Sequence, residues 1–302
     1  MAIVAIIVVI PLASIATYGT NSGQSVAPID STKLKVISSF NILHEFSQEI
    51  GQEKIDATLL VPIGIEPHDW EPTIRNVQEM QKADLIIING IGFENWVTDL
   101  QENNYHGTIV DTSVGILDKN HDEKDDHDEK DDHAHSTDSH IWLNPNYAKI
   151  QVHNIASAFS KSDPENREFY LSNAEKYVEK LTLLDSRIQN ELYGCSRDFV
   201  SFHNAFSYFA EEYDLNQHAI IESNDSHGEV TAKTLENVIS ISKKLNIKVI
   251  FSEENASTKT SEIIANEIGG KVLVLSPLEV ASDGTYVSKM TENLENLKEA
   301  LC

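Results

Sequence analysis

One long stretch of helical spacing in the middle of the chain constrains the possible folds more than any other feature. Between residues 164 and 193, apolar side chains recur at intervals of three and four, from Tyr170 to Leu192. Pro164 suits the first turn of this helix, and Gly194 suits its end. At about 1.5 Å per residue the helix would be ~45 Å long, about twice the length of an ordinary crossover helix. We therefore predict a spacer helix that packs against two separate lobes.

Short apolar runs alternate with helical patterns on both sides of this stretch, four before it and four after it. Some of them, such as residues 84–88, are almost continuously apolar, which is typical of parallel strands covered on both faces. Strands that alternate with helices indicate parallel sheets with crossover helices. The predicted fold is therefore α/β, with two lobes that are each a roughly four-stranded parallel sheet flanked by helices, joined by one long backbone helix. The strand-like runs lie at residues 35–39, 56–61, 84–88, 108–110, 198–202, 218–221, 248–252 and 271–275.

The same pattern predicts the domain boundaries. An N-terminal lobe covers residues 34–161, the linking helix covers residues 162–194, and a C-terminal lobe covers residues 195–302. Residues 1–33 stand apart as a signal peptide or membrane anchor followed by a linker. The apolar run at residues 2–16 is short for a membrane-spanning helix and long enough for the core of a signal peptide. Whether it is a signal peptide or a membrane anchor, this run predicts an extracytoplasmic protein that is secreted across the membrane. If the run is not cleaved, it would anchor the protein to the membrane.

The charge of the chain argues against one class of partner and favours another. With 23 basic and 48 acidic residues, the formal net charge is −25. Binding to nucleic acid needs clustered Lys and Arg side chains, so we expect no nucleic acid partner. An acidic protein attracts cations.

The chain contains two cysteines, Cys195 and Cys302. Two are too few for a cysteine-rich zinc finger or a dense disulfide framework. They can form a single bridge or remain as thiols, and their sequence spacing does not give the distance between them. We expect two free thiols, with one bridge as the alternative.

Residues 118–139 interrupt the alternation of strands and helices. The hexapeptide His-Asp-Glu-Lys-Asp-Asp occurs twice in succession, at residues 121–126 and 127–132. Ten acidic and three basic residues give residues 118–139 a net charge of −7, and almost nothing apolar is present to bury, so we expect a disordered loop. Histidines among carboxylates favour weak, exchangeable metal capture over a merely solvated charge run. These auxiliary candidates are His121, His127, His133 and His135.

Three histidines and one carboxylate lie just past a strand-like run, or where order is expected to resume after the acidic loop. The first histidine stands between Pro67 and Pro72, which restrict the backbone on both sides. In open α/β sheets, ligands bind just outside the carboxyl ends of the strands. Three neutral imidazoles with one carboxylate suit a borderline divalent ion, zinc above all, although copper or nickel would bind such a set at least as well. The candidate ligands are His68, His140, His203 and Glu279.

Several sequence motifs surround these candidate ligands in a fixed order. They are Pro-His-Asp-Trp-Glu-Pro at 67–72, Ala-Asp-Leu-Ile-Ile-Ile-Asn-Gly at 83–90, Phe-Glu-Asn-Trp at 93–96, His-Ile-Trp-Leu-Asn-Pro at 140–145, Ser-Phe-His-Asn-Ala-Phe at 201–206 and Leu-Ser-Pro-Leu-Glu at 275–279. Together they resemble the zinc and manganese solute-binding proteins of ABC importers, closest to the zinc-uptake group. The resemblance covers about residues 34–301.

The resemblance implies two lobes joined by a rigid backbone helix, with the metal buried between them and delivered to the membrane permease of an ABC importer. An acidic, histidine-rich loop between the first two ligand histidines is typical of zinc members, whereas manganese members tend to have a carboxylate where this chain has His203. Many relatives use an aspartate as the fourth ligand. Glu279 is the candidate in this chain, with Asp283 or a water molecule as the alternative.

We therefore expect an extracytoplasmic solute-binding protein, monomeric and without enzymatic activity, that captures zinc (Zn2+) and delivers it to an ABC-type importer. The alternatives are binding of manganese or another divalent metal, a metal-binding surface adhesin of the same fold, and a zinc hydrolase. A hydrolase would keep three protein ligands and an open fourth position, and the chain contains neither Gly-x-Ser-x-Gly nor a phosphate-binding glycine loop. Glu253, at the end of a strand-like run, is expected either to hydrogen-bond to a ligand histidine or to be exposed.

Overall fold

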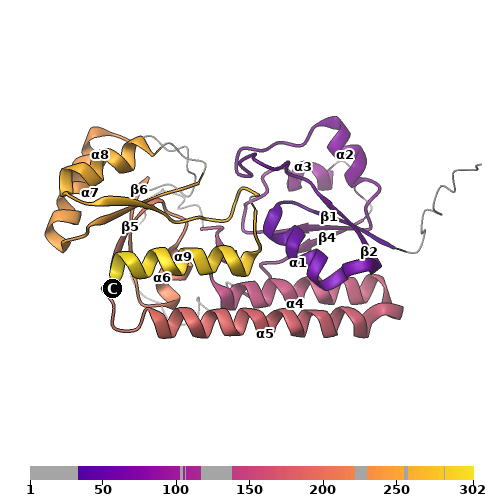
Figure 1. Ribbon diagram of the computed structural model, residues 1–302. Helices are drawn as coiled ribbons and strands as arrows, with labels where there is room; N and C mark the ends of the chain where they lie inside the picture. Colours follow the sequence, from indigo (N-terminus) through magenta and orange to yellow (C-terminus); the bar gives the residue numbers. More distant parts are fainter. Residues whose placement is uncertain are drawn as a thin grey trace, which may run out of the picture. The chain divides into compact units, whose positions relative to one another are not determined.

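Two four-stranded parallel sheets, one formed by the chain before the long helix and one by the chain after it, are the framework of the fold (Figure 1). The computed structural model describes residues 33–102, 105, 107–116, 138–221, 230–254, 258–281 and 283–302. The strands lie in the order β2-β1-β3-β4 in the first sheet and β6-β5-β7-β8 in the second. Every pair of neighbouring strands is parallel. The predicted α/β fold, two parallel-sheet lobes joined by a long helix, is confirmed.

The strands begin and end within two residues of the predicted runs. They are β1 (Leu34–Ser38), β2 (Ile55–Leu59), β3 (Leu85–Ile88), β4 (Thr108–Asp111), β5 (Asp198–His203), β6 (Asn216–Ile221), β7 (Val249–Ser252) and β8 (Lys271–Val274). The helices are α1 (Asn41–Gly51), α2 (Ile74–Met80), α3 (Val97–Glu102), α4 (Pro145–Ser162), α5 (Arg167–Glu191), α6 (Ser207–Glu212), α7 (Ala232–Leu245), α8 (Lys259–Ile268) and α9 (Tyr286–Leu301). The central strands β3 and β7 are buried at every position, as expected for strands of which β3 is entirely apolar and β7 is apolar except for Ser252.

The long helix α5 begins three residues later than the pattern predicts, because residues Pro164–Asn166 form a 3₁₀ turn. The Asp163 carboxylate does not cap this turn. It accepts hydrogen bonds from Asn166 Nδ2 and the Tyr170 hydroxyl, each 2.7 Å away. The buried face of α5 packs on α1 and α4, which precede it in the chain, and on α9, which follows it. The helix is therefore shared by both halves of the chain.

Helix α9 is not among the helices that the sequence pattern predicts. Its apolar residues occur only about once per turn, at positions such as Met290, Leu294 and Leu297, and polar residues fill the intervals. A capping box between Thr285 and Ser288 starts the helix. Because α9 packs along α5 and against the second sheet, the residues of this narrow apolar stripe are buried.

Cys195 and Cys302 form a disulfide, so the expectation of two free thiols is wrong. Cys195 lies just after α5 and Cys302 just after α9, and the packing of these helices brings their Cα atoms within 4.7 Å of each other. Closing a loop of this length stabilises a folded chain by about 4–5 kcal/mol in the chain-entropy model. The sequence pattern misses the bridge because it does not predict α9.

The largest buried cluster includes side chains from both halves of the chain, among them Trp142, Tyr177, Phe199 and Leu294. Smaller clusters fill the outer side of each sheet. Residues Lys33–Cys302 form one compact unit as a result. Within the part of the chain that is described, no helix combines the length and the apolar character needed to cross a membrane.

Candidate metal centre

The structure brings the four predicted ligand side chains together beside the carboxyl ends of the strands. His203 is the last residue of β5. His68 lies between β2 and α2, and His140 directly precedes the 3₁₀ turn Ile141–Leu143. Glu279 lies between β8 and α9. His68 follows a strand of the first sheet, whereas His203 ends a strand of the second sheet and Glu279 follows another, so both sheets present the carboxyl ends of their strands to this group.

Four of the five contacts between the donor atoms, at 3.2 to 3.5 Å, have the spacing of a small cation site, and the fifth is a short hydrogen bond between Glu279 and His140. His140 Nε2 is 3.3 Å from both His68 Nε2 and His203 Nε2. Glu279 Oε1 is 3.2 Å from His68 Nε2, 2.5 Å from His140 Nε2 and 3.5 Å from His203 Nε2. Zinc–nitrogen bonds of about 2.0–2.1 Å in a tetrahedron place the donor atoms about 3.3–3.4 Å apart. His68, His140 and Glu279 offer ligand atoms that all lie within 4.8 Å of one another. His203 is not a member of this closest group, but it contacts His140 and Glu279.

Two carboxylates outside this group orient the buried histidines. The Nδ1 atom of His203 is hydrogen-bonded to Glu253, which also accepts the His203 backbone N–H. Of the two alternatives that the sequence leaves for Glu253, the structure has the hydrogen bond to a candidate ligand histidine, and the side chain is buried rather than exposed. His140 Nδ1 lies 2.6 Å from Asp138 Oδ1. When Nδ1 donates its proton outward, the lone pair of Nε2 faces the site.

Asp138 is a residue that the sequence pattern did not single out, because it stands at the end of the acidic stretch. Its carboxylate also accepts the Ser207 hydroxyl, and its backbone carbonyl accepts the Tyr208 hydroxyl at 2.9 Å. Its spacing from His140 could have identified it, since an aspartate often accepts the backbone N–H two residues ahead. Glu66 repeats this spacing before His68, whose backbone N–H lies 3.4 Å from Glu66 Oε1.

An aromatic wall covers one side of the group. The rings of His68 and Phe93 are 4.7 Å apart, and those of His140 and Trp142 are 5.0 Å apart. Phe93 and Trp142 in turn contact each other. His140 and His203 are fully buried, whereas 14% of the His68 side chain is exposed. Solvent therefore reaches the group at His68.

The electrostatics of the group are those of a strongly coupled cluster. Burial by itself would raise the pKa of Glu279, but hydrogen bonds from the three histidines hold it well below its usual range. Burial would likewise lower the histidine pKa values, but the neighbouring carboxylates raise them to about 9 for His140 and about 10 for His203. Burial, followed by repulsion from Glu279, raises the pKa of Glu66 to about 8. A divalent cation would replace the protons on these imidazoles and keep the carboxylate ionised.

The other predicted metal residues are not in this group. Asp283, the alternative fourth ligand, is exposed and does not contribute to the cluster of donor atoms. His121, His127, His133 and His135 lie outside the described residues.

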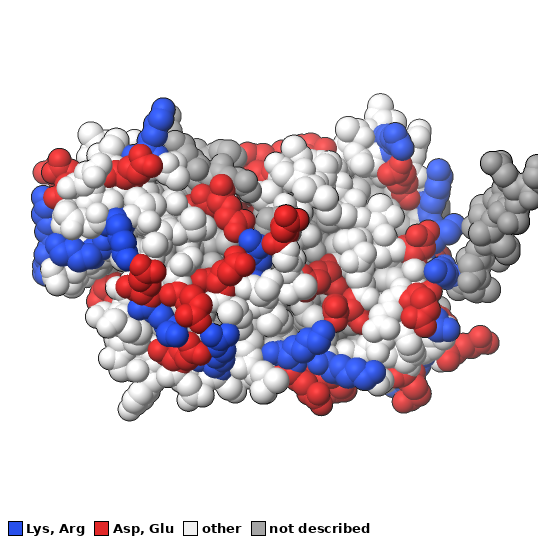
Figure 2. Space-filling view, viewed as in Figure 1, with Lys and Arg blue, Asp and Glu red and all other residues white. Residues whose placement is uncertain are grey.

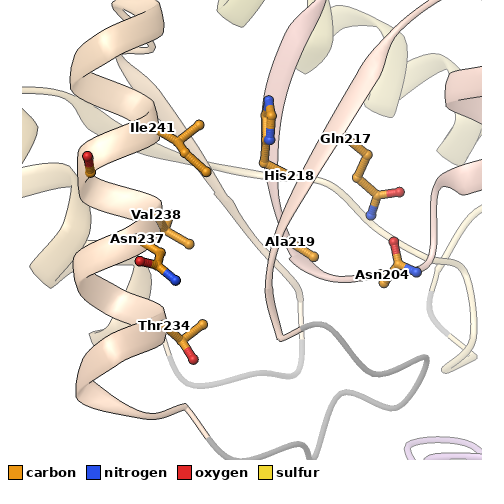
Figure 3. Close-up of a pocket in the computed structure, with 9 residues that line it drawn as sticks. Asn204, Gln217, His218, Ala219, Thr234, Asn237, Val238 and Ile241 are labelled. Carbon is orange, nitrogen blue, oxygen red and sulfur yellow. The ribbon is translucent and has the colours of Figure 1, made fainter. Parts of the chain in front are cut away.

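A separate pocket lies between β6 and α7, with a volume of about 490 Å³ (Figure 3). Gln217, His218 and Asn237 are among the residues that line it. The Gln217 side-chain amide donates to the His203 carbonyl oxygen at 3.0 Å. The lining contains none of the four candidate ligands, so the pocket is not part of the metal centre.

The sequence matches one protein family over most of its length. Residues 36–300 match the model of ZnuA, described as zinc-uptake complex component A, periplasmic. The high-affinity zinc uptake system protein ZnuA of Bacillus subtilis (strain 168) is 36% identical over 299 residues, which cover 95% of this chain and 93% of that protein.

Solved structures are similar over the same region. A crystal structure of ZnuA has a TM-score of 0.77 and 30% sequence identity, and the match covers 89% of this chain and 100% of that one. The laminin-binding protein Lmb of Streptococcus agalactiae, described as a bifunctional protein with adhesin and metal transporting activity, has a TM-score of 0.77 and 27% identity. That match covers 88% of this chain and 99% of Lmb.

Proposed function

We infer the function of this protein from one premise: the chain belongs to the ZnuA family, the periplasmic component A of zinc-uptake complexes. Members of this family bind a solute for transport, so the chain is an extracytoplasmic solute-binding protein for zinc and not an enzyme. Its partners are the zinc ion, which is its cargo, and the membrane permease of an ABC importer.

We propose that His68, His140, His203 and Glu279 are the ligands of the transported zinc ion. The observation that carries this proposal is the 3.3 Å separation of His140 Nε2 from both His68 Nε2 and His203 Nε2, which equals the edge of a zinc tetrahedron. Three imidazoles and one carboxylate would fill the four coordination positions of a zinc ion. Two of the imidazoles have their Nδ1 atoms held by carboxylates. Burial of Glu279 favours it over the exposed Asp283 as the oxygen ligand.

X-ray absorption at the zinc edge, combined with zinc titration of variants, tests this ligand set. The expected spectrum has three nitrogen ligands and one oxygen ligand at about 2.0–2.2 Å. Replacing any of the three histidines by alanine should remove one nitrogen ligand and weaken zinc binding. His218→Ala is the matched control, because His218 pairs with Asp198 instead. A spectrum that keeps three nitrogens after His68→Ala would contradict the proposal.

We propose that the acidic histidine-rich stretch collects zinc for this centre. The stretch has a net charge of −7 and ends just before His140, so it raises the local concentration of cations beside a ligand. Its composition gives it no apolar core with which to preform a tight site. Deleting residues 118–137 should slow zinc capture and remove weak zinc sites while leaving the tight affinity nearly unchanged. Calorimetry on both proteins measures this, and loss of tight binding on deletion would contradict it.

Two further parts of the proposal concern the state of the protein in the cell. We propose that it acts as a monomer, because the four ligands come from one chain. We propose that the apolar run at residues 2–16 either directs export or anchors the protein outside the cytoplasm. Light scattering of the zinc-bound protein and N-terminal analysis of the protein isolated from its host test the two statements.

The likeness to Lmb favours adhesion as a second candidate function. Adhesion would use the outer surface and leave the zinc centre intact. Binding of the zinc-loaded protein to immobilised laminin tests this candidate, and no binding above that of an unrelated acidic protein would exclude it.

A further inference from the structure

Glu45 is a carboxylate of α1 that lies away from the metal centre, at the point where α1, α5 and α9 meet. Each of its oxygens accepts one hydrogen bond. The Tyr177 hydroxyl of α5 donates to Glu45 Oε1, and the Tyr286 backbone N–H of α9 donates to Glu45 Oε2, both at 2.8 Å. The side chain thus joins three helices from both halves of the chain.

Tyr286 connects Glu45 to the proposed metal centre, because it contacts both Glu45 and a neighbour of His140. As the first residue of α9, it has a backbone N–H without a partner inside the helix, and a carboxylate there also interacts favourably with the helix dipole. Its buried hydroxyl donates to the Trp142 carbonyl oxygen at 2.7 Å. The ring of Trp142 contacts His140.

The segment before α9 carries Glu279 and is fixed at several points. The Trp142 indole N–H donates to the Pro277 carbonyl oxygen at 2.8 Å. Asn293 of α9 exchanges two hydrogen bonds with the backbone of Ser276, at 2.7 and 2.8 Å. Between these anchors and Glu279, Leu278 has a φ of +59°, a conformation that a leucine holds only when its surroundings enforce it. The direction of the Glu279 carboxylate therefore depends on the placement of α9, which supplies Asn293, and of Trp142, which the first residue of α9 contacts.

We propose that Glu45 is a positioning residue for the metal centre, which holds the start of α9 and thereby the segment that presents Glu279. This inference rests on the ligand set proposed above. Without Glu45, the Tyr286 N–H and the Tyr177 hydroxyl lose their acceptor, and the first turn of α9 gains freedom. Glu279 then spends less time in the position where it meets the three histidines, so zinc binds more weakly and leaves faster.

A double-mutant cycle between Glu45→Ala and Glu279→Ala tests the inference, with the zinc Kd measured by competition against a chromophoric chelator. Glu45→Ala should weaken zinc binding about tenfold in the wild-type background. It should change the Kd by less than about twofold in the Glu279→Ala background, because the group that it positions is already gone. Equal factors in both backgrounds would overturn the inference.

Two variants separate positioning from a general loss of stability. Glu45→Gln should bind zinc nearly as well as the wild type, because the amide oxygen can accept the Tyr286 N–H while the amide nitrogen donates to the Tyr177 oxygen. Glu49→Ala is the matched control on the same helix, since Glu49 only pairs with Lys180 at the surface, 2.9 Å away. A loss of affinity in Glu49→Ala as large as that in Glu45→Ala would overturn the inference.

Tyr286→Phe tests the next contact of the same path, from the first residue of α9 to Trp142, and can be measured even if Glu45→Ala does not fold. It removes only the hydroxyl that bonds the Trp142 carbonyl, and its control is Tyr170→Phe, which removes a hydroxyl bonded to Asp163. The same dependence on Glu279 is expected for Tyr286→Phe, and an unchanged Kd would overturn the inference. If Glu279→Ala alone leaves the Kd unchanged, the proposed ligand set is wrong as well. If it weakens binding but the cycle is additive, only the role of Glu45 is wrong.

Discussion

At the scale of single residues, the proposed metal centre depends on what each of the two nitrogens of a buried imidazole contacts. In His140 and His203, Nδ1 faces a carboxylate and Nε2 faces the cluster. A carboxylate behind an imidazole fixes the ring and increases its basicity as a metal ligand. The two buried rings are therefore already oriented for binding a cation in the absence of one.

Glu253→Gln should weaken zinc binding by about tenfold, because the amide can still hold the His203 ring but removes the charge that raises its basicity. Glu254→Gln is the matched control, since the neighbouring Glu254 pairs with Lys289 at 3.0 Å instead. Chelator competition on both variants measures the difference. Equal affinities for the two variants would show that the charge of Glu253 does not act on the centre.

The stability of the metal-free protein should fall as the pH rises above neutrality. The folded-state pKa values of about 9 for His140 and about 10 for His203 lie above the unfolded value. Their stabilisation is thus complete below a pH of about 6.5 and is lost as the pH rises through the folded values. In the zinc-bound protein the imidazoles are already neutral, so Tm should depend less on pH. Thermal melts between about pH 7 and pH 9.5 check this, and a metal-free Tm that rises over this range would contradict it.

At the scale of elements, the packing of α9 on α5 links the two halves of the chain at the end away from Glu279. Lys298 and Arg187 form ion pairs between the helices, with Glu191 and Glu295 respectively. Figure 2 shows such interspersed acidic and basic side chains over the face that it presents. Exposed pairs of this kind contribute little stability each, so the disulfide is the main tie at this end.

Replacing Cys195 and Cys302 by serine should lower the free energy of unfolding by about 2–5 kcal/mol. The zinc Kd should change little, because the bridge lies at the end of α9 and Glu279 precedes its start. Urea denaturation and zinc titration of the double variant measure the two quantities. A large loss of zinc affinity in the folded double variant would show that both ends of α9 control the centre.

At the scale of the whole molecule, α5 and the main core belong to both halves of the chain. Helix α5 packs on α1, α4 and α9, and the largest buried cluster draws on both sheets. Rotation of one half against the other would have to break this packing, whereas a hinge of two flexible strands would not. Residues Lys33–Cys302 thus form one compact unit.

Zinc binding should therefore change the overall dimensions of the protein very little. Small-angle scattering curves of the metal-free and zinc-bound forms should nearly superimpose when a variant that lacks residues 118–137 is used, so that the acidic stretch does not contribute. A marked compaction of that variant on addition of zinc would contradict a rigid connection between the halves.

The sequence by itself determined the fold and the positions of the three histidines. Apolar runs such as residues 84–88 are local signals, and strands that alternate with helices form parallel sheets whose carboxyl ends meet at one edge. His68 could be found because it lies after β2, and His203 because it ends β5. The family resemblance indicated that the ion bound by these residues is zinc.

Only the tertiary structure decided which other groups meet these histidines. Glu253 and Asp138 contact imidazoles, whereas Asp283 stays outside the cluster. The tertiary structure also brings Glu45 to the start of α9, which is 241 positions away in the sequence. The disulfide depends on a helix whose sparse apolar stripe is a weak signal by itself. Contacts of this kind lie between residues far apart in the chain, and their geometry is set by how helices and sheets pack, which local periodicity does not encode.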